Sequence, residues 1–285
     1  MAIIENLIWG KLALSEIGQA VALNAEAGWN QTAADWQFML ERGEGTGVSE
    51  QALVATSMLL PHGDRFAWIA MILVTAKWQR QGLASALMRR CIDRAAILGM
   101  VPGLDATEAG RKVYLPLGFQ DIYALTRWQA DNLKIAPGAS ASAAVRPMLP
   151  GDLSAVADWD AGIFGARRGD LLTHLHNRCP DRAFLLERGG EIQGFVLARD
   201  GRLATQIGPL SANSDRDAIA LLGAALTGHA GPVFLDAADH HGGLATWLRD
   251  SGFTKQRGYV RMLLGSRTPI DDPERVFIIA GPELG

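Results

Sequence analysis

The stretch KWQRQGLASALMRR occupies residues 77–90 and follows directly on the apolar run AWIAMILV at 67–74. The apolar run is typical of a buried strand, and the spacing of Leu83, Leu87 and Cys91 places them on one face of a helix. Between the two, the chain passes through basic residues and a glycine. One interpretation is an ordinary strand-to-helix connection. The other is that bare N–H groups at the helix start are available to phosphate oxygens.

The composition indicates a globular protein with more than one domain. The chain has 285 residues, of which 48% are hydrophobic and 20% charged, and a typical domain has about 100–200 residues. The formal net charge is −3, which gives no general attraction for nucleic acids or anionic membranes. Any anion site must therefore be a local feature.

Cysteine and hydropathy patterns exclude several classes. Cys91 and Cys179 are too few for a disulfide framework and have no zinc-ligand spacing. The longest uncharged apolar run, near 66–76, is far shorter than the roughly 20 residues that span a bilayer. The start MAIIENLIWGK carries Glu5 early and lacks the features of a signal peptide. We therefore expect a cytoplasmic protein without a metal, nucleic-acid or membrane partner.

A segment of small residues divides the chain. IAPGASASAAV at 135–145 is uncharged and rich in Pro, Gly and Ser, a composition typical of linkers. We predict a first domain over 1–134, a linker over 135–144, a second domain over 145–265 and a tail over 266–285. The tail contains VFIIAG, which could add an edge strand to either domain.

Hydrophobic periodicity predicts a mixture of helices and strands in the first domain. Thr32 is the expected N-cap of a helix. The mixed order favours an α/β or α+β fold. The predicted elements are helices over 11–27, 33–41, 83–98 and 109–117 and strands over 51–61, 66–75, 100–107 and 119–128.

The second half repeats features of the first. LDAT at 104–107 recurs as LDAA at 235–238, and Gly118-Phe119 recurs as Gly252-Phe253 at nearly the same offset. Each GF pair is followed by a strand that ends in arginine and a large apolar residue, first as ALTRW and then as GYVRM. Matching order at a nearly constant spacing predicts a tandem duplication.

The connection before the first long helix has the pattern Q/R-x-x-G-x-G/A. Small residues at 82 and 84 allow the backbone to approach a bulky anion closely, and the helix dipole favours negative charge there. Lys77 and Arg80 add positive charge beside the turn. The pattern consists of Gln79, Arg80, Gln81, Gly82, Leu83 and Ala84.

The segments WIAMILVTAKWQRQGLASALMRRCIDRA and LDATEAGRKVYLPLGF together resemble the GNAT-type N-acetyltransferase superfamily. In that superfamily a strand, a pyrophosphate loop, a helix, a further strand and a Y-x-x-x-GF segment occur in this order. The resemblance implies two tandem GNAT-like domains, each a central mixed sheet flanked by helices, with acetyl-CoA as co-substrate. It places the pyrophosphate on Gln79 to Ala84 and the pantetheine beside the backbone at Met71, Ile72, Leu73 and Val74.

The resemblance also implies catalytic roles. Tyr114 stands where GNAT enzymes commonly place a tyrosine as general acid near the CoA sulfur, and a phenol with a pKa of about 10 can donate a proton at neutral pH. A backbone N–H near Ile72 or Leu73 could polarise the thioester carbonyl. The alternative for Tyr114 is a core tyrosine whose hydroxyl is bonded elsewhere.

No general base stands out. Asp105 and Glu108 lie close in sequence to Tyr114 and could bind or deprotonate an amine, although the sequence DAT favours a helix-capping role for Asp105. Trp29 lies where the first helices of GNAT domains wall the acceptor site, and it is equally well explained as a packing residue.

The second domain is expected to lack a cofactor. The segment SANSDRDAIALL at 211–222 has no phosphate-loop pattern and places Asp215 and Asp217 where a phosphate would lie, so like charges would oppose binding. Trp247 stands where the first domain has Tyr114.

We therefore predict an acetyl-CoA-dependent N-acetyltransferase that transfers an acetyl group directly to the primary amine of a small molecule. Two alternatives stay open. One is a non-catalytic CoA-binding or regulatory module, and the other is an enzyme that acetylates a protein lysine or N-terminus. The sequence identifies neither the acceptor nor the oligomeric state, since function resides in the site and not in the fold.

Overall fold

The computed structural model describes residues 6–131, 133 and 144–285. The predicted linker at 135–144 lies outside these residues except for Ala144. The described residues form two compact units. The first unit consists of the residues up to Leu104 together with Gly201–Leu203 and Leu284. The second unit consists of the remaining residues, from Asp105 onward.

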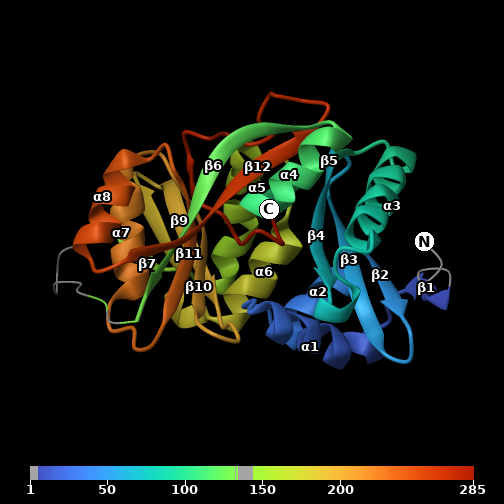
Figure 1. The fold of residues 1–285 in the computed structure, drawn as a ribbon. Coiled ribbons are helices and arrows are strands. Elements are labelled where there is room, and N and C mark those ends of the chain that lie inside the picture. The colour runs from blue at the N-terminus through green and yellow to red at the C-terminus, as the bar shows by residue number, and fades with distance from the viewer. Residues whose placement is uncertain (1–5, 132, 134–143) are drawn as a thin grey trace. The chain divides into compact units, whose positions relative to one another are not determined.

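The secondary structure follows the duplication (Figure 1). The first repeat contains β1 (Ile8–Lys11), α1 (Ile17–Ala27), α2 (Ala33–Arg42), β2 (Glu44–Ser49), β3 (Leu53–His62), β4 (Phe66–Val74), α3 (Leu83–Ile97), β5 (Val101–Thr107), α4 (Glu108–Tyr114) and β6 (Phe119–Ala130). The second repeat and tail contain β7 (Val145–Pro147), α5 (Leu153–Phe164), α6 (Gly169–Arg178), β8 (Phe184–Arg188), β9 (Glu191–Arg199), β10 (Thr205–Ala212), α7 (Asp215–Leu226), β11 (Val233–Ala238), α8 (Gly242–Asp250), β12 (Thr254–Leu264) and β13 (Val276–Ile278).

Most of the predicted elements of the first repeat are confirmed. The exception is the helix expected over 11–27, because β1 extends to Lys11 and α1 begins only at Ile17. Thr32 is confirmed as the N-cap of α2, and its backbone N–H donates to the Asp35 carboxylate at 2.7 Å. β2, with the sequence EGTGVS, was not expected because glycine is poor in strands.

The first unit is a sheet in the order β1-β2-β3-β4-β5 with helices packed on it. β3 is buried at nine of its ten positions, so both of its faces are covered. α3 packs on β3 and β4, while α1 and α2 pack on each other and on β3. This arrangement fixes the end of β4 and the start of α3 close together.

The second unit contains an exchange of strands between the repeats. Its strand order is β12-β6-β11-β13-β10-β9-β8-β7, and the end of β5 lies beside β12. β6, which belongs to the first repeat, pairs antiparallel with β11 of the second repeat from Val233↔Ala130 to Ala238↔Leu125. β12 belongs to the second repeat but neighbours β5 of the first. Each repeat therefore supplies a strand that completes the sheet of the other.

Two buried ion pairs follow the exchange. Arg127 on β6 donates from Nε and Nη2 to the Asp236 carboxylate on β11 at 2.8 and 2.7 Å. Arg261 on β12 donates from Nε and Nη2 to the Asp105 carboxylate on β5, at 3.0 Å in both cases. These four residues are the arginines and aspartates of the repeated motifs found in the sequence, so each arginine pairs with the aspartate of the other repeat.

The C-terminal tail enters the sheet. β10 and β11 pair in parallel only from Thr205↔Val233 to Ile207↔Leu235. Beyond that point β13 lies between them and runs antiparallel to both, with Ile278 opposite Leu210 and Ala237. The tail strand is therefore interior and not at a sheet edge, as was thought possible. A long apolar segment such as VFIIAG is suited to this position because it is covered on both sides.

Candidate cofactor site

A cleft opens in the first unit where β4 leaves β5. The two strands pair in parallel only from Phe66↔Val101 to Trp68↔Gly103. From Ile69 to Val74, β4 keeps its antiparallel pairing with β3 but makes no recorded pairing with β5. The β5-facing backbone of this second half of β4 is thus available to an extended ligand, in the manner of an added strand.

A bulge helps β4 to diverge. The register between β3 and β4 shifts between Thr56 and Met58, and Met71 has a positive φ of 53°. The Thr56 hydroxyl donates to the Met71 carbonyl at 2.9 Å and holds the bulged residue. Bulges bend a strand and are common beside functional sites.

The loop after β4 forms a concave set of backbone N–H groups. Arg80 and Gly82 have positive φ values of 60° and 91°, and Gly82 is the N-cap of α3. A left-handed residue between right-handed or extended neighbours turns successive N–H groups toward one side, which creates an anion-binding nest. The N–H groups of the first turn of α3 have no intrahelical acceptor and lie at the positive end of the helix dipole.

Backbone strain coincides with this site. Among the described residues, Met71 and Arg80 are the non-glycine residues with positive φ. Such conformations cost about 1–3 kcal/mol and persist at ligand sites. Both occur along the path from the β4 bulge to α3.

Apolar side chains fix the loop in place. Trp78 and Leu83, on either side of the nest, are 4% and 1% exposed and pack in one cluster with Leu87. Ile72 and Val74 pack partly buried against the same cluster. The strand, the loop and the helix start therefore share one core, which keeps the N–H groups preorganised.

The mouth of the cleft is a small cavity of about 150 Å³ between α1 and the end of β4. Two side chains bond to the backbone there. The Gln79 amide donates to the Val74 carbonyl at 3.1 Å, and the Ala76 N–H donates to the Glu26 carboxylate at 2.6 Å. Glu26 was not predicted, since nothing in the sequence near it signals that it reaches this loop.

The two predicted cations of the loop differ. Lys77 forms an exposed ion pair with Glu50 at 2.9 Å. Arg80 is exposed and makes no hydrogen bond or ion pair with the part of the chain that the structure describes. Gln81 anchors the turn, because its amide donates to the Lys77 carbonyl at 2.9 Å.

The corresponding opening in the second unit is closed. β13 occupies the space between the diverging β10 and β11. At the start of α7, the Ser214 hydroxyl accepts the Asp217 N–H at 3.2 Å, and Asp217 also pairs with Arg188. The hydrogen bond from Arg188 lowers the pKa of Asp217. This helix start is therefore capped by the chain's own side chains and carries negative charge.

The remaining predicted residues lie in the second unit, apart from Trp29. Tyr114 ends α4 and is half-buried, with its ring centroid 6.0 Å from that of Phe119. Glu108 is exposed and pairs with Lys112 at 3.0 Å. The acid role of Tyr114 and an amine-binding role of Glu108 stay predictions.

Asp105 is a structural residue and does not cap α4. The cap is Thr107, whose hydroxyl accepts from the Gly110 N–H at 3.2 Å. Asp105 is fully buried and held by both arms of Arg261. Burial outweighs the attraction of Arg261 and raises the pKa of Asp105. Arg261 also donates to Asp271 at 2.6 Å, so one cation serves two carboxylates.

Trp29 contacts a segment from the second half of the chain. Its carbonyl accepts from the Arg202 side chain at 3.0 Å. The Arg202 N–H donates to the Asn30 carbonyl at 2.8 Å, and the Asn30 side-chain oxygen accepts the Leu203 N–H at 2.9 Å. Gly201–Leu203 thus belong to the first unit, which no local signal in the sequence indicated.

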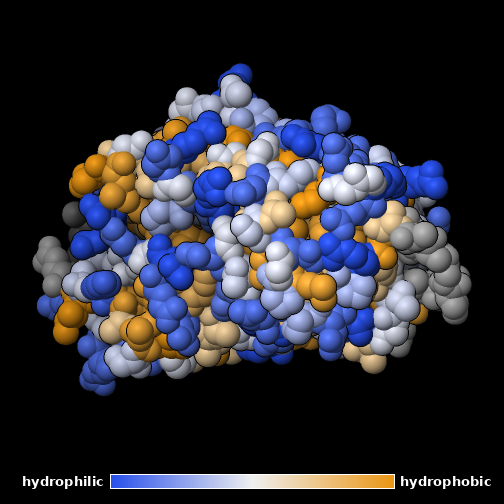
Figure 2. All heavy atoms as spheres, turned by 180° about the vertical axis from the view of Figure 1, so that it is seen from behind, coloured by the Kyte–Doolittle hydropathy of each residue, from blue (hydrophilic) through white to orange (hydrophobic). Residues whose placement is uncertain are grey.

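Other classes of site find no support in the described residues. Within them, no group of three or more His, Cys, Asp or Glu side chains could hold a metal. No helix of the described part is long and apolar enough to cross a membrane. On the face shown in Figure 2, hydrophobic residues form separate groups among hydrophilic ones.

Comparison with known proteins places both halves in one family. Residues 22–119 match the acetyltransferase (GNAT) family, and residues 156–278 match an acetyltransferase (GNAT) domain. The two matches together span most of the chain. The chain therefore belongs to the GNAT acetyltransferases and has two GNAT domains in tandem, as the resemblance in the sequence implied.

Solved structures share this architecture. The "Putative Acetyltransferase" of Pyrococcus horikoshii has a TM-score of 0.82 and 20% identity, over 100% of this chain and 98% of that chain. A GCN5-related N-acetyltransferase from Sphaerobacter thermophilus has a TM-score of 0.64 and 16% identity, over 94% and 96%. A tandem GNAT protein from the clavulanic acid biosynthesis pathway has a TM-score of 0.61 and 15% identity, over 90% and 98%. At these identities the likeness shows the fold. A search of curated proteins finds no match.

Proposed function

We propose that this chain is an acetyl-CoA-dependent N-acetyltransferase that binds one acetyl-CoA per chain, in the first repeat, and transfers the acetyl group directly to a primary amine of a small molecule. One observation carries the proposal. β4 diverges from β5 and leads directly into a strained nest of N–H groups at the start of α3. This combination offers a strand edge to an amide-bearing arm and a donor cradle to a diphosphate.

The residues that would hold the co-substrate follow from this geometry. The backbone of Ile72, Leu73 and Val74 would pair with the pantetheine arm, after the Gln79 amide moves from the Val74 carbonyl. The N–H groups from Gln79 to Ala84 would bind the pyrophosphate, with Arg80 as the nearby cation. When bound, acetyl-CoA supplies an activated thioester carbonyl.

The chemistry requires one proton to leave the amine and one to reach the departing thiolate. We assign the second proton to the Tyr114 hydroxyl, because a phenol is protonated at neutral pH. A β4 N–H at Ile72 or Leu73 would stabilise negative charge on the carbonyl oxygen. In this account the C–N bond forms as the C–S bond breaks, and the amine proton passes to water.

The structure also favours one rival function. Asp105 is locked in an ion pair and Glu108 is exposed at the surface, so neither offers an obvious base. A non-catalytic CoA-binding module would have this property. Acetylation of a protein lysine or N-terminus is a further alternative for the acceptor.

Free-thiol release from acetyl-CoA in the presence of a panel of primary amines tests the proposal. We expect amine-dependent release, and Tyr114→Phe to lower kcat by about 10²-fold or more without changing the Kd of CoA. The matched control is Trp247→Phe, at the same position of the second repeat, which should leave kcat unchanged. CoA binding without release for any amine or peptide would favour the non-catalytic module.

A further inference from the structure

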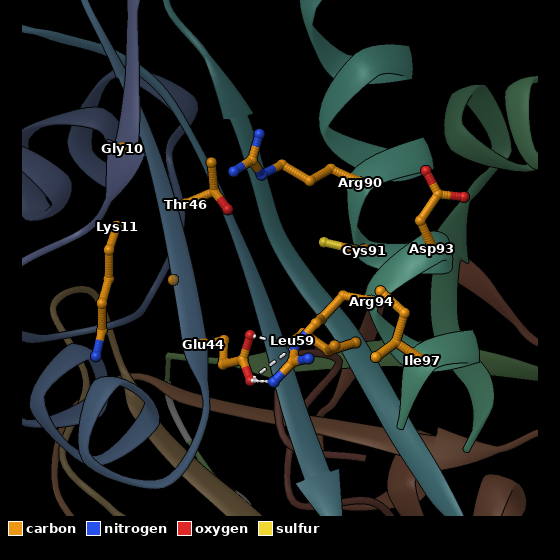
Figure 3. Close-up of a pocket in the computed structure, with 11 residues that line it drawn as sticks. Gly10, Lys11, Glu44, Thr46, Leu59, Arg90, Cys91, Asp93, Arg94 and Ile97 are labelled. Atoms are coloured by element: carbon orange, nitrogen blue, oxygen red, sulfur yellow. Dashed lines mark hydrogen bonds and ion pairs between the residues drawn. The ribbon is translucent and has the colours of Figure 1, made fainter. Parts of the chain in front are cut away.

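A second pocket lies in the first unit, away from the cofactor loop. It has a volume of about 490 Å³, within the range of roughly 300–1,000 Å³ for small-molecule sites. β1, β2 and β3 form one side and the last turns of α3 form the other (Figure 3). Arg90, in this wall, is eight residues beyond Gly82, about 12 Å along the helix axis.

The charges of this pocket are unevenly balanced. Arg94 donates to both oxygens of Glu44, at 2.7 to 3.0 Å, and Lys11 acts on the same carboxylate. The hydrogen bonds from Arg94 lower the pKa of Glu44. Arg90 makes no hydrogen bond or ion pair with the residues that the structure describes. Figure 3 shows its guanidinium extending toward Thr46, while Asp93 points away from the strands.

The floor of the pocket is apolar. Leu59 and Cys91 line it and are 2% and 5% exposed. Burial raises the pKa of the Cys91 thiol to about 11, so this thiol is neutral at physiological pH. Ile97 stands at the rim and is 74% exposed. An apolar ligand body could cover these surfaces while an anionic end faces Arg90.

We propose that this pocket binds a small monocarboxylate with an apolar body. The Arg90 guanidinium holds the carboxylate through its planar pair of donors, and the Thr46 hydroxyl lies beside it as a further donor. Leu59 and Cys91 contact the body. A single negative charge fits because one cation is uncompensated, whereas Glu44 repels a second charge. This site is separate from acetyl-CoA binding and does not depend on it.

Calorimetric titration of the full chain with 4-phenylbutyrate, and with the neutral 4-phenylbutyramide, tests this proposal. We expect saturable binding of the carboxylate and at least about tenfold weaker binding of the amide. Arg90→Gln should remove that preference. Gly10→Leu should block both probes, because a Cβ at Gly10 meets nothing within 4 Å and the new side chain extends into the pocket.

Arg89→Gln, on the adjacent exposed residue of α3, is the matched control and should bind 4-phenylbutyrate like the unmodified chain. Circular dichroism of each variant verifies folding. Failure of 4-phenylbutyrate to bind at millimolar concentration overturns the proposal. Equal binding of acid and amide, or binding that neither Arg90→Gln nor Gly10→Leu weakens, overturns it as well. CoA titration of the same variants keeps this result separate from the fate of the proposed acetyltransferase function.

Discussion

The two repeats diverge at the same point of the fold and treat the opening differently. β4 separates from β5 after Trp68, and β10 separates from β11 after Ile207. In the first unit the opening leads to a glycine-capped helix start with a strained turn. In the second unit the chain's own β13 fills it. One architecture can therefore serve as a ligand cleft or as a closed core, depending on whether a strand occupies the gap.

The helix starts beside the two openings show the same contrast. Ala84 and Arg216 are both the second residue of their helix, and both are exposed. Before Ala84 the cap is a glycine without a side chain, so the N–H groups stay open. Before Arg216 the cap is Ser214, and Asp215 and Asp217 bring negative charge. Only the first start offers uncapped donors to a phosphate.

The largest expected effect concerns what the repeats share, the reciprocal ion pairs. Arg261→Met should lower the free energy of unfolding by about 3–5 kcal/mol, because it leaves buried carboxylates without their cation. Arg127→Met should cost less, since it strands one carboxylate, Asp236, which keeps a hydrogen bond from Gln206 at 3.0 Å. Urea unfolding measures both.

Lys77→Met is the control for this comparison. It removes an exposed pair and should cost less than about 1 kcal/mol. An Arg261→Met variant as stable as this control would show that the exchanged strands do not depend on the buried pairs.

The next effect concerns the closed opening. Ile278→Ala should destabilise the chain by about 2–5 kcal/mol, because Ile278 is fully buried between the diverging strands and its loss leaves a cavity. Ile278→Val should cost only about 0.5–1.5 kcal/mol. Thermal unfolding gives both values. The affinity for CoA should stay unchanged, and a parallel loss of CoA binding would break the assignment of the cofactor to the first opening.

A smaller effect is expected from pH. Burial lowers the pKa of His241 below 6.5, and its ring stacks on Phe277 of β13 at 3.7 Å. The unfolded chain then takes up a proton at a higher pH than the folded chain. Stability should therefore be full at neutral pH and decline as the pH falls through 6.5. His241→Phe should flatten this decline in urea titrations between about pH 7 and pH 5.5. An unchanged slope would contradict this.

The smallest effect concerns the mouth of the first opening. Glu26→Gln should tighten CoA binding by up to about fivefold, because it removes a carboxylate near the diphosphate at an exposed position. Binding of pantetheine, which has no phosphate, should not change. Calorimetry with both ligands distinguishes a charge effect from a change in the cleft.

Much of the local structure could be predicted from the sequence. Apolar periodicity indicated β4, α3 and β6, and the glycine at position 82 marked the helix start. The motif repeats also predicted the duplication. β1 and β2 were missed because they are short or rich in glycine, which leaves little periodic signal.

Long-range features could not be predicted. The exchange of β6 and β12 depends on which strand edges meet, and pairing partners leave no mark on local periodicity. The insertion of β13 is of the same kind, because an apolar segment fits an interior gap as well as an edge. Asp105 was assigned to a local cap, whereas its partner Arg261 lies far along the chain and on the other repeat.

The most direct test of the central claim is calorimetric titration of CoA into the unmodified chain, Ala84→Glu and Arg216→Glu. We predict one equivalent of CoA for the unmodified chain, loss of binding in Ala84→Glu through repulsion at the first helix start, and full binding in Arg216→Glu. Absence of binding to the unmodified chain, two equivalents, or equal binding by Ala84→Glu would contradict the claim that the first opening alone holds the cofactor.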